Sequence, residues 1–175
     1  GKDGNLIRAD RLKRTKRDPD SNVERVIDLG LVGQPKVIST AVLDAFKDSD
    51  VIPVIAPIGT GPDGETLNIN ADTAAGAIAA ATQACRMYML TDVDGVLDAD
   101  QNLISELKVS EAQAAIEAGV ITGGMIPKIE TCIEAIQGGV DGAAIIDGRI
   151  SHTVLVELLD RKGVGTLLKL RYRTP

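Results

Sequence analysis

The chain has 175 residues, a formal net charge of −6, 44% hydrophobic residues and 25% charged residues. This balance is typical of one soluble globular domain, and the acidic charge argues against a general nucleic-acid-binding or membrane surface. No apolar run reaches the length of a membrane span, and the first residues lack a signal peptide's apolar core. Cys85 and Cys132 are too few for a disulfide framework or metal cluster and are predicted to be buried thiols. We therefore expect a cytoplasmic protein without nucleic-acid or membrane partners.

The first thirty residues carry the signals of a β-hairpin. Two β-favouring runs, residues 6–14 and 23–29, flank the polar cluster at residues 18–21, which predicts a turn between two strands. The basic run at residues 8–17 falls on this hairpin. We interpret it as a solvated arm in preference to a polyanion-binding site.

The rest of the chain alternates short apolar runs with helical segments. Aromatic residues make up only 2% of the sequence, so the core must be aliphatic, which favours parallel strands covered by Ala-rich helices. We predict an α/β fold with a mainly parallel sheet. Predicted helices cover residues 36–47, 72–84, 110–118 (with Ser110 as N-cap), 129–137 and 152–159. Predicted strands cover residues 51–58, 86–90 and 143–147, the first as a buried strand that ends against a loop.

Polar residues that follow apolar strands are the candidate site residues, since ligands of open parallel sheets bind at the carboxyl ends of strands. The first group is Asn68, Asn70 and Asp72 at the entry to an Ala-rich helix. Asn70 or Asp72 could cap this helix. The functional alternative is that the asparagine amides hold an anionic substrate while Asp72 orients cationic groups. Three such residues exceed what one cap needs, which favours a site.

The second group is the loop at residues 91–97, where a predicted strand ends in Thr91 and the pattern Asp-x-Asp-Gly follows. In a haloacid-dehalogenase-like phosphatase, Asp92 would attack phosphorus and Asp94 would handle protons. A plain turn is the structural alternative. A calcium loop fits worse, because the required glycine and distal glutamate are absent.

The third group is Gly123-Gly124, followed by Pro127 and Lys128 at the start of a helix. Backbone N–H groups at such a helix end suit phosphate, and Lys128 would stabilise charge on a transferring phosphoryl group. The alternative is a glycine-capped helix whose lysine extends to water. No Walker loop occurs, so an ATP site must be of another type. The only histidine, His152, is interpreted as structural or regulatory.

Taken in order, these stretches resemble the acetylglutamate kinases of the amino-acid kinase family. The resemblance rests on residues 1–4, 28–33, 67–72, 90–97, 123–128, 145–149 and 163–167. It implies that ATP, bound with Mg²⁺, phosphorylates the γ-carboxylate of N-acetyl-L-glutamate in arginine biosynthesis. The implied mechanism is direct in-line transfer without a covalent enzyme intermediate.

The resemblance also implies residue roles. Asn68 and Asn70 match the asparagines that line the acetylglutamate site. Asp72 matches the aspartate that organises the catalytic lysines, and Lys128 matches the lysine that stabilises the transferring phosphoryl group. The implied nucleotide-binding residues are Thr91, Asp92, Val93, Asp94, Gly95, Val96, Leu97, Val120, Ile121, Thr122 and Met125.

The family's amino-terminal motifs, a Lys-x-Gly-Gly loop and a second catalytic lysine, do not occur in this chain. We therefore expect residues 1–175 to be a single ATP-binding domain that lacks the amino-terminal substrate domain and is inactive when isolated. A non-catalytic nucleotide-binding fragment and a sister amino-acid kinase are the alternatives. The full-length enzyme is expected to be a homo-oligomer. Ala144 replaces a histidine usual in arginine-inhibited members, whereas Glu157 and Gly163 match that group.

Overall fold

The computed structural model describes residues 1–17, 24–160 and 163–170. The chain divides into two compact units, Gly1–Ala81 and Thr82–Pro175, and each unit has its own sheet. The polar cluster at residues 18–21, the expected hairpin turn, lies outside the described residues. None of the helices formed by the described residues is long and apolar enough to cross a membrane.

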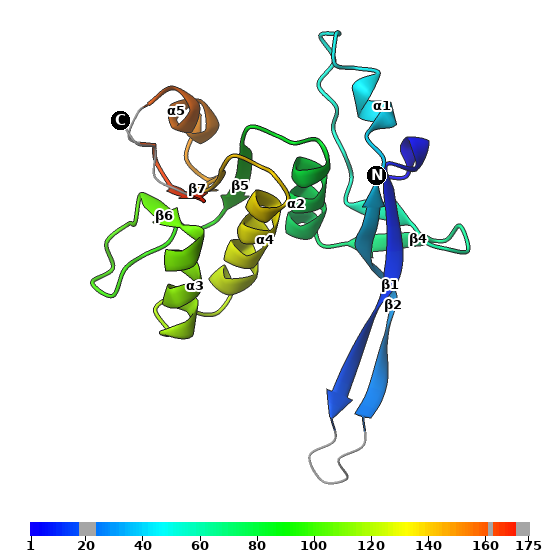
Figure 1. Cartoon of the computed structure of the whole chain (residues 1–175), viewed down its shortest axis with the longest axis horizontal. Helices are drawn as coiled ribbons and strands as arrows, with labels where there is room; N and C mark the ends of the chain where they lie inside the picture. Colours follow the sequence, from blue (N-terminus) through cyan, green and yellow to red (C-terminus); the bar gives the residue numbers. More distant parts are fainter. Residues whose placement is uncertain (18–23, 161–162, 171–175) are drawn as a thin grey trace. The chain divides into compact units, whose positions relative to one another are not determined.

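The first unit is built around a small closed barrel with the strand order β1-β2-β4-β3 (Figure 1). Its strands are β1 (Ile7–Arg17), β2 (Glu24–Ile38), β3 (Ile58–Thr60) and β4 (Thr66–Ile69). β1 pairs antiparallel with β2, and β3 with β4, whereas β1–β3 and β2–β4 are parallel pairs. Three short elements complete the unit: the 3-10 helix η1 (Asp3–Asn5) and the helices α1 (Ala41–Asp44) and α2 (Ala71–Ala81).

Glycines let this barrel close around a narrow interior. A Cβ atom on Gly33 would lie 2.8 Å from the Cβ of Leu67, and one on Gly59 would lie 3.0 Å from the Cβ of Ala9. Any larger residue at these positions would push the facing strands apart. The buried core of the unit consists of Leu6, Ile7, Ala9, Leu67, Ile69 and Ala74.

Two predictions for the first unit are wrong. Residues 51–58 do not form a buried strand: β3 begins only at Ile58, and Ile52 and Val54 are 85% and 95% exposed. Pro53 and Pro57 lack the N–H groups that a ladder requires, and in the described strand pairings only Ile58 of this segment takes part, opposite Asn68 of β4. The helix predicted over residues 36–47 is reduced to α1, because β2 continues through Ile38 opposite Ile7.

The second unit is a four-stranded sheet in the order β5-β7-β8-β6. The strands are β5 (Met87–Thr91), β6 (Glu106–Lys108), β7 (Ala143–Asp147) and β8 (Thr166–Lys169), and the helices are α3 (Val109–Glu117), α4 (Met125–Gln137) and α5 (Thr153–Leu159). β5–β7 and β6–β8 are parallel pairs, and β7–β8 is antiparallel. Helices α3 and α4 pack together on one side of the sheet and α5 lies on the other (Figure 1). The predicted α/β class with parallel strand pairs is confirmed.

Three local predictions in the second unit need correction. Ser110 is not the N-cap of α3: the helix begins at Val109, and the backbone N–H of Lys108 donates to Oε2 of Glu111 at 2.9 Å. Cys132 is buried as predicted, but Cys85 is exposed, and both are free thiols. The strands β6 and β8 were not expected, because their short, partly charged sequences carry no strand pattern of their own.

Candidate functional site

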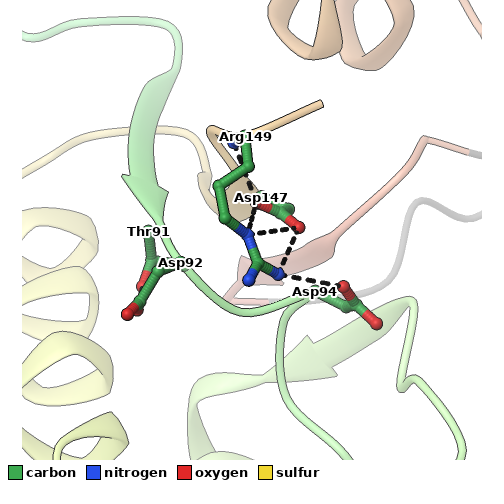
Figure 2. Close-up of polar contacts among 5 residues, drawn as sticks. All are labelled: Thr91, Asp92, Asp94, Asp147 and Arg149. Atoms are coloured by element: carbon green, nitrogen blue, oxygen red, sulfur yellow. Dashed lines mark hydrogen bonds and ion pairs between the residues drawn. The ribbon is translucent and has the colours of Figure 1, made fainter. Parts of the chain in front are cut away.

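The carboxyl ends of β5 and β7 lie side by side, because the two strands pair in parallel with Thr91 opposite Asp147. The backbone N–H of Gly148 donates to the carbonyl oxygen of Thr91 at 2.8 Å, which extends this pairing into the following loops. The loop at residues 92–97 therefore begins next to Arg149 (Figure 2). A ligand bound at this edge would contact both segments.

Arg149 is held against the carboxylate at the end of β7. Its Nε donates to Oδ1 of Asp147 at 2.9 Å, its Nη2 donates to Oδ2 at 2.8 Å, and its backbone N–H donates to Oδ1 at 2.9 Å. These hydrogen bonds, those of the guanidinium first, lower the pKa of Asp147 to about 2. The same contacts raise the pKa of Arg149. The pair is therefore charged at neutral pH.

The outer part of the loop is acidic and exposed. Nη2 of Arg149 lies 4.0 Å from Oδ1 of Asp94, and Oγ1 of Thr91 donates to Oδ1 of Asp92 at 3.3 Å (Figure 2). Asp92, Val93 and Asp94 are all exposed. Among the described residues, no group of three or more His, Cys, Asp or Glu side chains is arranged to hold a metal ion.

The inner end of the loop is fastened by a buried hydroxyl. Thr166 Oγ1 accepts a hydrogen bond from the backbone N–H of Val96 at 2.8 Å and donates to the carbonyl oxygen of Ile104 at 2.7 Å. Thr166 is 0% exposed. Gly95 has a φ of +146°, and a Cβ there would lie 2.7 Å from this hydroxyl, so only glycine fits. Thr166 and Val96 are far apart in sequence, and no local pattern could have identified this contact.

The helix α4 presents its first turn to the same edge of the sheet. It packs against β7 and joins that strand through a short link, so it runs opposite to β7 and begins at the strand's carboxyl side. Gly124 is the N-cap, Pro127 is the third helical residue, and Lys128 follows, half-buried. The predicted start at residue 129 is one turn late.

The residues that lead into α4 differ in how exposed they are. Ile121 is 3% exposed, Val120 and Thr122 are exposed, and Met125 is half-buried. In the loop itself, Thr91 and Leu97 are half-buried, while Gly95 and Val96 are buried. The predicted nucleotide-binding residues thus all lie on the loops and helix start that flank one edge of a single sheet, together with Lys128.

The first candidate group lies in the other unit, at the junction of β4 and α2. Asn68 is exposed on β4 between the buried Leu67 and Ile69. Asn70 caps α2: its Oδ1 accepts hydrogen bonds from the backbone N–H of Thr73 at 3.1 Å and from its hydroxyl at 3.3 Å. A ligand contact from Asn70 would therefore come from its amide NH₂.

Asp72 is half-buried in the first turn of α2. The candidate site residues thus fall into two sets, with Asn68, Asn70 and Asp72 in the first unit and the loops around Lys128 in the second. Asn68, Asn70 and Asp72 lie at the junction of β4 and α2, and the loop at residues 92–97 and the start of α4 flank one edge of the second sheet. Asp147 and Arg149 enter the sequence analysis only within the motif at residues 145–149, although an aspartate that ends a buried strand and an arginine two residues later indicate a salt-bridged loop.

Sequence comparison identifies the family of this fold. The sequence model of the amino acid kinase family matches residues 1–147. The chain belongs to the amino acid kinase family. Acetylglutamate kinase of Rhodospirillum rubrum is 59% identical over 169 residues, which is 97% of this chain and 54% of that protein. Acetylglutamate kinase of Gluconobacter oxydans is 61% identical, over 97% of this chain and 57% of that protein. The chain thus spans about half the length of these relatives.

Two solved structures have a similar fold. N-acetylglutamate synthase from Neisseria gonorrhoeae, in complex with coenzyme A and L-arginine, matches with a TM-score of 0.80 and 28% identity, over 96% of this chain and 37% of that one. Carbamate kinase from Giardia lamblia bound to AMP-PNP matches with a TM-score of 0.64 and 23% identity, over 90% of this chain and 52% of that one. The second likeness supports the fold alone.

Proposed function

We propose that this chain is the ATP-binding part of an acetylglutamate kinase, which phosphorylates the γ-carboxylate of N-acetyl-L-glutamate in arginine biosynthesis. One observation carries the proposal. The nucleotide loop at residues 91–97 and the first turn of α4 with Lys128 flank one edge of a sheet in a chain that is 59% identical to an acetylglutamate kinase. Membership in a kinase family removes the reason to treat Asp92 as a phosphatase nucleophile.

The second unit supplies the nucleotide side of the reaction. The start of α4 offers backbone N–H groups and the positive end of a helix dipole to the phosphates. Lys128 stabilises the charge that develops on the transferring phosphoryl group as the substrate carboxylate attacks in line. Mg²⁺ enters with ATP, whose phosphate oxygens and water molecules provide its ligands.

The first unit supplies the acceptor side. Asn68 and the amide NH₂ of Asn70 hold N-acetyl-L-glutamate, and Asp72 organises the catalytic lysines of the full-length enzyme. Both units thus act as one ATP-binding domain within a longer cytoplasmic, homo-oligomeric enzyme. A non-catalytic nucleotide-binding fragment is the alternative, favoured by the fact that the chain spans 54% of the length of a relative.

The test is an assay of the full-length protein with ATP, N-acetyl-L-glutamate and hydroxylamine. We expect an acyl hydroxamate, formed from the acyl phosphate product, and its absence refutes the proposal. Lys128→Ala should lower kcat by about two orders of magnitude or more. Lys36→Ala is the control, since Lys36 forms a surface ion pair with Asp10 in the other unit. Turnover by the isolated 175-residue chain would contradict its assignment as a partial site.

A further inference from the structure

We propose that Arg149 is a positioning residue for the nucleotide: by bridging Asp147 and Asp94, it sets the conformation of the loop at residues 92–97. This inference rests on the proposed function, since it concerns how that loop binds ATP. Arg149 lies beyond residues 1–147, the part of the chain that the family's sequence model matches.

The guanidinium of Arg149 has a fixed orientation. Two of its nitrogens bind the two carboxylate oxygens of Asp147, whose side chain is only 5% exposed. Asp147 itself ends β7, a strand in which every residue is buried. A planar fork bound to a buried carboxylate loses little further freedom when it makes another contact. Arg149 is therefore a rigid extension of the sheet edge.

The nitrogen that donates to Oδ2 of Asp147 also faces the loop. Nη2 of Arg149 lies 4.0 Å from Asp94, and their side chains are 63% and 70% exposed. An isolated surface pair of this kind contributes little to stability. Here, however, Arg149 is already immobilised by Asp147, and the other end of the loop is fixed by the hydrogen bond from Val96 to Thr166. Two fixed points only a few residues apart leave the intervening backbone few conformations.

Charge gives the contact a second consequence. Asp92, Asp94 and Asp147 place three carboxylates at the edge where a polyanionic nucleotide is proposed to bind. Asp147 first, and attraction to Asp92 and Asp94 after it, raise the pKa of Arg149, so the guanidinium also offsets this negative field. Positioning and neutralisation both favour nucleotide binding, but they predict opposite effects for the removal of Asp94.

Asp94→Asn separates the two roles. If Arg149 acts only by neutralising charge, loss of the Asp94 carboxylate should strengthen nucleotide binding, because one repulsive charge disappears. If Arg149 positions the loop, Asp94→Asn should weaken binding, because the loop loses one of its two fixed points. We expect weaker binding. Asp94 is exposed, so this variant also tests the proposal without disturbing the buried end of β7.

The experiment uses the full-length protein and a non-hydrolysable ATP analogue with Mg²⁺. For Arg149→Lys and Asp94→Asn we expect the dissociation constant of the analogue and the KM for ATP to rise about ten-fold, with kcat and the KM for N-acetyl-L-glutamate nearly unchanged. Lysine keeps the positive charge but not the planar guanidinium, so Arg149→Lys should not restore nucleotide binding to the wild-type level. Amide hydrogen exchange at residues 92–97 should become faster in both variants.

Glu106→Gln is the matched control, because it removes an ion pair of the same unit, 2.9 Å long, between Glu106 and Lys169. It should leave analogue binding unchanged. Tighter binding by Asp94→Asn, unchanged binding by both variants, or a parallel loss of every kinetic constant would overturn the positioning role. A wild-type protein that binds no analogue would refute the proposed function together with this inference, whereas wild-type binding that both variants retain refutes the inference alone.

Discussion

The buried hydroxyl of Thr166 provides a sharp test of how the loop is held. Thr166→Val replaces the hydroxyl by a methyl group of similar size and leaves the side-chain volume nearly unchanged. The backbone N–H of Val96 then loses its acceptor and the carbonyl oxygen of Ile104 loses a donor. Both groups contact a side chain that is 0% exposed, so water cannot replace it without a rearrangement.

The expected loss of folding stability follows from these two polar groups, each of which loses a hydrogen-bond partner. Each buried polar group left without a partner costs about 1–3 kcal/mol, and the added methyl group returns part of that through apolar contact, which leaves about 2 kcal/mol. The urea midpoint should fall with an unchanged slope, and amide exchange at Val96 should become faster. Binding of the ATP analogue should weaken as well, because the loop loses its inner fixed point.

Thr153→Val is the matched control. Thr153 is also buried, but among the described residues its hydroxyl has no hydrogen-bond partner. Replacing it removes a desolvated polar atom without breaking a bond, so stability should stay the same or rise slightly. Equal urea midpoints for Thr166→Val and Thr153→Val would show that the Thr166 hydrogen bonds do not hold the loop, and the reasoning would fail.

Two further predictions concern Asp147 and Asn70. Because the folded pKa of Asp147 is depressed to about 2 from its ordinary 3.8, its stabilising contribution is present above pH 3.8 and is lost as the pH falls toward 2. The difference in urea midpoint between wild type and Asp147→Asn should therefore shrink over that window, and a constant difference would contradict the assignment. Asn70→Ala should destabilise the first unit by about 1 kcal/mol through loss of the cap on Thr73, whereas Asn70→Asp should keep the cap. In the full-length enzyme Asn70→Asp should nevertheless raise the KM for N-acetyl-L-glutamate, because the aspartate places a negative charge next to the anionic substrate where the asparagine offered an amide donor. An unchanged KM would remove Asn70 from the proposed substrate site.

Sequence patterns predict well those helices and strands that are determined by residues near to one another in the chain. The helices α2, α3 and α4 come from Ala-rich or amphipathic segments bounded by capping residues and glycines, and β7 is a continuous apolar run with the predicted limits. The candidate residues also emerged locally, because polar groups after buried strands mark the carboxyl edge of a sheet. The amino acid kinase family was recognisable for the same reason, from short motifs in order.

The remaining features depend on partners that are distant in sequence. Closure of the barrel requires Gly33 to face Leu67, and no pattern around residue 33 predicts that strand contact. The apolar run at residues 51–58 has the composition of a buried strand. Burial, however, depends on which other parts of the chain pack over a segment, and Ile52 remains exposed.

The loop at residues 92–97 illustrates both sides of this division. The sequence alone predicts that this loop follows an apolar strand and contains aspartates, since strand ends and turn residues are local signals. Its conformation is decided by two contacts made only in the folded chain, Arg149 with Asp94 and Thr166 with Val96. Hydrogen bonds act over about 3 Å and ion pairs over about 4 Å, so their partners are chosen by the packing of the sheet and not by nearness along the chain.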